Sequence, residues 1–155
     1  LRIRAALDAK KEGADILIMA RTDARSTHGL EEALWRCQAF TKMGADIVFL
    51  EAPQSENEMI RFCKEVSGIK MANMVEQGKT PILNPERLEA IGYKIAAYPL
   101  TLLSASIRSM QEALSNIKTG KYANNLLEFE KLKELVGFPE YYQEEKRYSS
   151  KIESP

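Results

Sequence analysis

The chain has 155 residues, of which 45% are hydrophobic and 28% are charged, as in an ordinary soluble globular domain. Lys and Arg together number 22, and so do Asp and Glu, so no net charge favours binding to nucleic acid or to a membrane surface. No apolar run approaches the ~20 residues that span a bilayer. We therefore expect neither a nucleic-acid partner nor a membrane partner.

The chain begins with Leu1 inside a helical pattern and without an initiator methionine, so we expect that its beginning is missing. Its two cysteines, Cys37 and Cys63, suit a reduced cytoplasmic protein better than a disulfide scaffold. Both lie on the apolar faces of predicted helices, which indicates that they fill the core.

Apolar runs predict four short strands, each preceded by a helix and a glycine. The sequence Gly-Ala-Asp-Ile occurs at residues 13–16 and again at 44–47, which marks an internal repeat of this unit. Strands are predicted over residues 15–20, 47–50, 71–72 and 95–98. Helices are predicted over residues 1–12, 30–43, 55–66 (opening with a capping box), from Asn84 to Gly92, and over 102–119 and 126–136.

Strands that alternate with helices form parallel βαβ units, so the fold class is α/β. A complete (β/α)8 barrel takes ~250 residues, which makes four units half a barrel; an open doubly wound sheet is the alternative. The strand at 15–20 is predicted to be buried on both faces. The helix at 102–119 is predicted to face inward with Ile107, Met110, Leu114 and Ile117.

Polar side chains end three of the four strands. Arg21 follows the first strand, Glu51 the second and Asn73 the third. Because the carboxyl ends of parallel strands meet at one edge of a sheet, we expect these side chains to converge on one pocket. Each also has a structural alternative: a rim ion pair of Arg21 with Asp23, a helix-capping carboxylate, and a turn-forming asparagine.

Four motifs at these strand ends carry a family resemblance. They are ARTDA at residues 20–24, FLEAP at 49–53, NMVE with GKTP at 73–81, and YPLT at 98–101. In this order and spacing they resemble the second half of the isocitrate lyase / phosphoenolpyruvate mutase superfamily, and the resemblance runs to about residue 148. It implies the C-terminal half of a (β/α)8 TIM-type barrel at residues 1–120, followed by a C-terminal helical segment at 121–155.

The resemblance implies a Mg²⁺-dependent lyase that cleaves a C–C bond in a small 2-hydroxy or 2-oxo diacid. The family's metal-binding acidic residues and its catalytic loop lie in the first half of the barrel. We therefore expect the Mg²⁺ ligands upstream of Leu1, none in this segment, and no activity from the segment alone. A phosphonomutase is one alternative, and a non-catalytic half-barrel is another.

Matching the motifs residue by residue implies roles for five positions. Arg21 matches the substrate-binding arginine, and its guanidinium suits a carboxylate or a developing enolate oxygen. Glu51 matches an acidic residue that supports the substrate by hydrogen bonding, and together these two are the implied catalytic residues. Asn73 matches an asparagine that binds a substrate carboxylate, and Met74 and Val75 fall in the same substrate-contacting stretch.

Two departures bear on the branch of the family. Methylisocitrate lyases have an arginine where this sequence has Ser104, and a Thr-Glu-Phe-Gly loop where it has Val-Glu-Gln-Gly at 75–78. Both favour the branch that resembles carboxyphosphonoenolpyruvate mutase, oxaloacetate hydrolase and 2,3-dimethylmalate lyase.

Other residues point away from different chemistries or toward assembly. Lys70 and Lys94 precede their strands and Lys79 lies in a polar loop, which disfavours a Schiff-base aldolase. A single histidine makes no metal site by itself. The tail carries Phe138, Tyr141, Tyr142 and Tyr148, which indicates either docking on its own barrel or contact in a homo-oligomer; we expect the oligomer, and the resemblance implies a tetramer-like helix swap between subunits.

Overall fold

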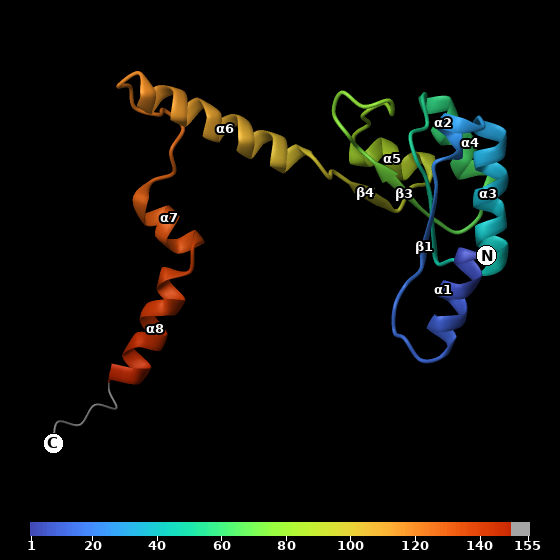
Figure 1. The fold of residues 1–155 in the computed structure, drawn as a ribbon, viewed down its shortest axis with the longest axis horizontal. Coiled ribbons are helices and arrows are strands. Elements are labelled where there is room, and N and C mark those ends of the chain that lie inside the picture. The colour runs from blue at the N-terminus through green and yellow to red at the C-terminus, as the bar shows by residue number, and fades with distance from the viewer. Residues whose placement is uncertain (150–155) are drawn as a thin grey trace. The chain divides into compact units, whose positions relative to one another are not determined.

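The structure, a computed structural model, describes residues 1–149. The chain divides into two compact units, Leu1–Ala105 and a second unit that begins at Ser106. The first unit holds the whole sheet, and the second holds most of α6 together with the last two helices (Figure 1).

The first unit is built on one parallel sheet of four strands in the order β1-β2-β3-β4. The strands are β1 (Met19–Thr22), β2 (Ile47–Leu50), β3 (Ile69–Asn73) and β4 (Ile95–Ala97). The predicted α/β fold of consecutive parallel βα units is confirmed. β1 and β4 are the two edges of the sheet, since the hydrogen-bonded order places each beside one neighbour only.

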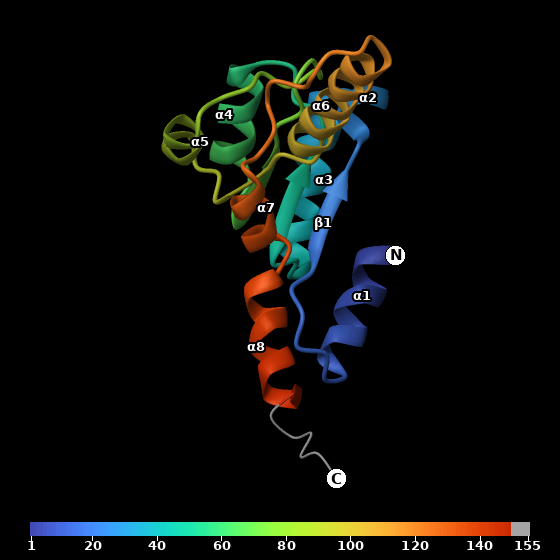
Figure 2. The ribbon, with the colours of Figure 1, turned by 90° about the vertical axis from the view of Figure 1, so that its left-hand side faces the viewer.

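The helices between the strands cover one face of the sheet. Figure 2 looks onto the strands with α3 behind them. The helices of this unit are α1 (Arg2–Lys11), α2 (Ala24–Thr27), α3 (Leu30–Met43), α4 (Glu56–Glu65) and α5 (Pro85–Ile91). They are followed by α6 (Thr101–Lys118), α7 (Phe129–Leu135) and α8 (Phe138–Ser149).

Helix caps follow the sequence closely. Asn84 accepts a hydrogen bond from the backbone N–H of Arg87 at 2.8 Å, and Ser55 accepts one from that of Glu58 at 3.2 Å. Gly44 ends α3 in the left-handed conformation that glycine adopts readily. The capping box is only half formed, because the Glu58 carboxylate binds the N–H of Gln54 rather than that of Ser55.

The core lies between the sheet and its covering helices. Val48 and Leu50 of β2 pack there with Phe62 of α4 and Cys37 of α3. Because side chains alternate along a strand, the residues between them, such as Phe49, point to the opposite face. Both cysteines belong to this core or pack against it, as predicted.

Three sequence-based expectations about burial and boundaries are wrong. β1 begins at Met19 rather than at residue 15, and Ile16 and Leu17 are 53% and 68% exposed. Within β1, Met19 is 41% exposed whereas Ala20 is fully buried, so the first strand is buried on one face only. In α6 no residue is buried, so its four apolar residues do not face inward in the described part of the chain.

Smaller corrections concern the ends of elements. Lys70 lies within β3 rather than before it, although still near the amino end of the strand. The helix predicted to start at residue 126 starts at Phe129. No helix in residues 1–149 is both long and apolar enough to cross a membrane.

One ion pair links α1 to the residue that precedes β2, at the amino end of the sheet. The Nζ of Lys10 on α1 lies 2.8 and 2.7 Å from the two carboxylate oxygens of Asp46, which precedes β2. The same carboxylate accepts the backbone N–H of Ile18 at 2.7 Å. Asp46 therefore holds α1 and the residues leading into β1 together.

Burial makes the two thiols unreactive. It raises the pKa of Cys37 to about 12 and that of Cys63 to about 11, since a thiolate is poorly stabilised among apolar side chains. We expect native protein at pH 8 to react with a disulfide reagent such as dithionitrobenzoate at least ~100-fold more slowly than unfolded protein. Two equivalents should react in guanidinium chloride, and one thiol reacting natively at the unfolded rate would contradict the core placement.

Candidate active site

Arg21 is the centre of a charged cluster at the carboxyl end of the sheet. Its Nε and Nη2 donate to the two carboxylate oxygens of Asp23 at 3.1 and 2.7 Å. Its Nη2 also lies 3.2 Å from the Glu51 carboxylate, and its guanidinium sits 5.2 Å from the centroid of the Phe49 ring. The β1–β2 register pairs Arg21 with Phe49, which explains this stacking.

Glu51 stands directly after β2 and is held by its backbone. Its N–H donates to the carbonyl oxygen of Thr22 at 3.0 Å and so extends the β1–β2 ladder. Its Oε2 is buried and makes no hydrogen bond in the described chain, because the nearby Arg21 Nη2 is within ion-pair distance but not aligned to donate. A buried acceptor without a donor is costly, so this oxygen is available to a bound molecule.

The backbone next to Glu51 is strained. Ala52 has a φ of 55°, in the left-handed region, which costs a non-glycine residue roughly 1 kcal/mol. Pro53 follows and is buried. Strain of this kind persists only where the surroundings enforce it, and it is common at functional sites.

The electrostatics of the cluster keep Arg21 charged. Its pKa is raised, chiefly by the hydrogen bond to Asp23; burial opposes this as the second-largest effect, and the charges of Glu51 and Asp23 add smaller upward contributions. One cation and two carboxylates give the trio a net charge of −1. Within residues 1–149, Nη1 of Arg21 has no hydrogen-bond partner, so its two N–H groups can bind a ligand.

Asn73 is the last residue of β3 and lies, like Arg21 and Glu51, at the carboxyl end of the sheet. The register pairs Phe49 with Met71, so Asn73, two residues further along, lies on the same face as Arg21 and in the row of Glu51. Its side chain is half-buried and makes no hydrogen bond to any other described residue. The structure thus brings Arg21 and Glu51 into contact and places Asn73 on their side of the sheet.

Met74 and Val75 can take part only in limited ways. The Met74 side chain is fully buried in the core on the helix side, and its N–H donates to the carbonyl of Ala97 at 2.8 Å. Only the carbonyl oxygen of Met74 is left to contact a ligand. The carbonyl of Val75 accepts the N–H of Gly78 at 3.0 Å in a turn, and its side chain is half-buried.

Further polar contacts near the strand ends were not predicted from the sequence. Asp23 is the principal partner of Arg21, although it was considered only as a structural alternative. Thr101 donates to the Glu76 carboxylate at 2.5 Å, and this hydrogen bond lowers the pKa of Glu76. The signal that could have found Asp23 is a carboxylate directly after the first strand, whereas Thr101 and Glu76 are 25 positions apart and carry no comparable local signal.

The residues present do not fit a resident Mg²⁺ by themselves. Among residues 1–149, no group of three or more His, Cys, Asp or Glu side chains could hold a metal ion. The carboxylates of Asp23 and Glu51 face a guanidinium instead, which occupies the place of a cation. We therefore derive no step through a metal held by these residues.

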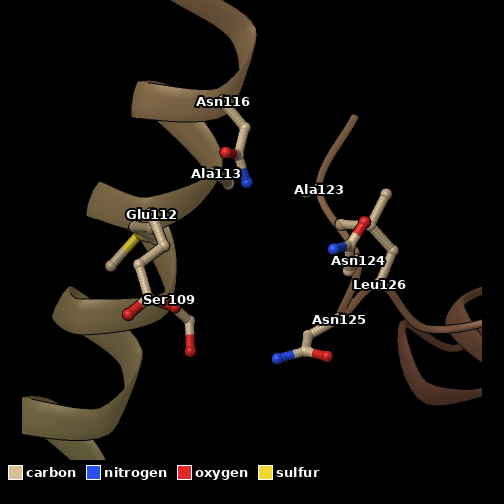
Figure 3. A pocket seen from close by; sticks show the side chains of 9 residues that line it. Ser109, Glu112, Ala113, Asn116, Ala123, Asn124, Asn125 and Leu126 are labelled. Atoms are coloured by element: carbon tan, nitrogen blue, oxygen red, sulfur yellow. The ribbon is translucent and has the colours of Figure 1, made fainter. Parts of the chain in front are cut away.

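A hollow in the second unit is a weaker candidate for a site. It lies between α6 and residues 123–126, with the amides of Asn116 and Asn125 pointing into it from opposite walls (Figure 3). Glu112 beside it pairs with Arg108 at 2.6 Å. The hollow offers amides and a neutralised carboxylate, and it belongs to a unit that contains none of the strand ends.

Parallel βα units with a charged cluster at the carboxyl ends of the strands define an enzyme-like half of a TIM-type barrel. The chain belongs to the phosphoenolpyruvate phosphomutase family, whose sequence profile matches residues 1–118. The predicted membership of the isocitrate lyase / phosphoenolpyruvate mutase superfamily is confirmed.

The relatives of this chain are enzymes about twice its length. It is 37% identical to 2,3-dimethylmalate lyase of Eubacterium barkeri over 96% of this chain and 53% of the relative. It is 35% identical to a 2-methylisocitrate lyase of Aeropyrum pernix, over 98% of this chain and 50% of the relative. Oxaloacetate acetylhydrolase, solved with the inhibitor 3,3-difluorooxalacetate, superposes with a TM-score of 0.86 at 25% identity, over 98% of this chain and 52% of that one.

Proposed function

We propose that this chain is the C-terminal half of a Mg²⁺-dependent lyase that cleaves a C–C bond in a small 2-hydroxy or 2-oxo diacid. One observation carries the proposal: the Arg21 guanidinium and the Glu51 carboxylate lie 3.2 Å apart at the carboxyl ends of adjacent strands. Membership of a family of lyases and mutases supports the reaction class.

Arg21 would stabilise the negative charge that forms when the bond breaks. A base outside these 155 residues would take the proton of the 2-hydroxyl; the electrons of the broken O–H bond would form a carbonyl, and the C–C electrons would move onto carbon to give an enolate. The free Nη1 group of Arg21 would donate to the substrate carboxylate that takes up this charge. The contacts with Asp23 hold the guanidinium so that little reorganisation is needed.

Glu51 and Asn73 would hold the substrate. The buried Oε2 of Glu51 lacks a donor, so a substrate hydroxyl or a donor ordered by the substrate would satisfy it. The Asn73 amide would donate to the second carboxylate. The Val75 side chain and the Met74 carbonyl would complete this wall, while the Met74 side chain stays in the core.

The charge balance supports a requirement for a divalent cation. The trio of Arg21, Asp23 and Glu51 carries −1, and a dianionic substrate would add −2, so the site needs further positive charge. A divalent cation such as Mg²⁺, held by residues outside this chain, would supply that charge and act as a Lewis acid toward the substrate. We propose that its ligands lie in an N-terminal half-barrel outside these 155 residues. The term completed barrel denotes this chain joined to such a half.

The substrate is proposed to be a small diacid of the dimethylmalate or oxaloacetate type. Ser104 and the Val-Glu-Gln-Gly loop favour it over a tricarboxylate, although identities of 37% and 35% do not separate the two kinds of relative. A phosphonomutase is the second candidate, since the matching family is described by that activity. Among dimethylmalate, oxaloacetate, methylisocitrate and phosphonopyruvate, turnover of phosphonopyruvate alone would favour the phosphonomutase.

The central test replaces Arg21. In the completed barrel, assayed with Mg²⁺ on dimethylmalate, oxaloacetate, methylisocitrate and phosphonopyruvate, Arg21→Ala should lower kcat/KM at least ~10²-fold because it removes charge stabilisation. Arg61→Ala is the control, since Arg61 pairs with Glu31 and Glu65 on the helix surface and should leave kcat/KM within about twofold. A near-normal rate for Arg21→Ala would remove it from the mechanism.

The isolated chain should be inactive. Purified protein spanning residues 1–155 should show no Mg²⁺-dependent turnover of these acids, because residues 1–149 contain no group of His, Cys, Asp or Glu side chains that could hold the metal. Product formation can be followed by chromatography against the completed barrel as a positive control. Turnover by the chain alone would refute the assignment of the metal site to another half, and inactivity of the completed barrel would favour a non-catalytic half-barrel.

We propose that the second unit forms contacts in a cytoplasmic homo-oligomer. Its large apolar side chains are exposed, including those of Phe138, Tyr141 and Tyr142 on α8, and a free monomer rarely leaves such residues uncovered. Removing residues 121–155 from the completed barrel should lower the mass measured by light scattering from that of a tetramer-like assembly. An unchanged number of subunits would show that this segment does not hold the oligomer together.

A further inference from the structure

A second ion pair lies just outside the charged cluster and joins the two loops that carry it. The Nε and Nη2 of Arg25, on the short helix α2 after β1, donate to the two carboxylate oxygens of Glu58 at 2.8 and 2.7 Å. Glu58 lies on α4, after the loop that follows β2. Both side chains are largely buried, with 19% and 17% exposed, so the bidentate pair is shielded from solvent.

The same pair holds the loop between Glu51 and Ser55. Oε2 of Glu58 accepts the backbone N–H of Gln54 at 2.8 Å, and Nη2 of Arg25 donates to the Gln54 side chain at 3.1 Å. In the described chain, the backbone groups of Ala52, Pro53 and Gln54 make no other hydrogen bond. The loop next to the candidate catalytic carboxylate is therefore tethered by side chains.

This tether explains why Ala52 keeps its left-handed backbone. An alanine at a φ of 55° gains by relaxing to negative φ, which would turn the chain on either side of it. Glu51 precedes Ala52 directly, so such a relaxation would displace its carboxylate from Arg21. The contacts of Gln54 with Arg25 and Glu58 hold the loop on the far side of Ala52 and so favour the strained conformation.

We propose that Arg25 and Glu58 are positioning residues that set the distance between Arg21 and Glu51 by clamping the β2–α4 loop against α2. Among the described residues, neither forms an ion pair or a hydrogen bond with Arg21 or Glu51, and their role in turnover rests on the proposed lyase function. Arg25 lies on α2, four residues after Arg21 in the chain. The same ion pair therefore restrains both the segment that carries Arg21 and the loop that follows Glu51.

The chain offers a matched control at the other end of the sheet. Asp46 also accepts a cation and a backbone N–H with one carboxylate, from Lys10 and Ile18, and its pair is similarly sheltered, at 29% and 26% exposed. Removing either carboxylate should weaken folding in a comparable way. Only the Glu58 pair adjoins the strand ends, so only its loss should disturb the site.

The test compares Glu58→Gln with Asp46→Asn in the completed barrel, at a temperature where both variants are fully folded by circular dichroism. A purely structural defect lowers apparent kcat through the folded fraction and leaves KM unchanged. We expect Glu58→Gln to raise KM for the diacid at least ~5-fold and to lower kcat, and Asp46→Asn to keep both within about twofold. Arg25→Lys, which keeps the charge but loses the bidentate geometry, should restore part of the affinity relative to Arg25→Gln.

Crystal structures of the two variants supply a readout that does not depend on activity. In Glu58→Gln, Ala52 should move to negative φ and the Arg21–Glu51 separation should exceed 4 Å, the limit for an ion pair, while Asp46→Asn keeps both. If the unmodified completed barrel turns over no diacid, the lyase proposal is wrong. The two variant structures still test whether Arg25 and Glu58 hold the β2–α4 loop in position. An unchanged Glu51 position in Glu58→Gln would overturn the positioning role, as would equal kinetics for the two variants.

Discussion

The pairing of β1 with β2 is the constraint on which the candidate site depends. This register places Arg21 beside Phe49 and Thr22 beside Leu50, and the Glu51 N–H continues the ladder to the Thr22 carbonyl. Because side chains alternate along strands, a shift of one residue would send Arg21 into the core and bring Ala20 or Thr22 to the site. Packing of Val48 and Leu50 against α3 and α4 therefore decides where the charges meet.

Much of the fold followed from the sequence because its signals are local. Buried runs such as Ile47–Leu50 and the capping residue Asn84 specify elements without help from distant residues. Arg21 and Glu51 could be selected for the same reason, since each directly follows an apolar run in the sequence, although Arg21 lies within β1 itself. The sequence could not foresee that Ile16 and Leu17 would stay exposed, because the burial of an apolar run depends on which elements pack against it once the sheet is assembled.

The parts of the site that sequence reasoning missed depend on distant pairs. Arg25 and Glu58 are 33 positions apart, and neither stands at the end of a strand. The role of Met74 was similarly hidden: it directly follows β3, its N–H still bonds to the Ala97 carbonyl, and its side chain alternates toward the core. Periodicity along one segment indicates which way a side chain points, whereas two loops meet only once the sheet is assembled.

Stability and chemistry are divided between the two ends of this sheet. The Lys10–Asp46 fastening lies at the amino ends of the strands, where it touches no residue of the charged cluster. Loops at the carboxyl ends of the strands can therefore accept substitutions without disturbing the contacts that stabilise the sheet. Such a separation lets one scaffold be adapted by evolution to lyase, mutase and hydrolase reactions, the range of activities named among its relatives.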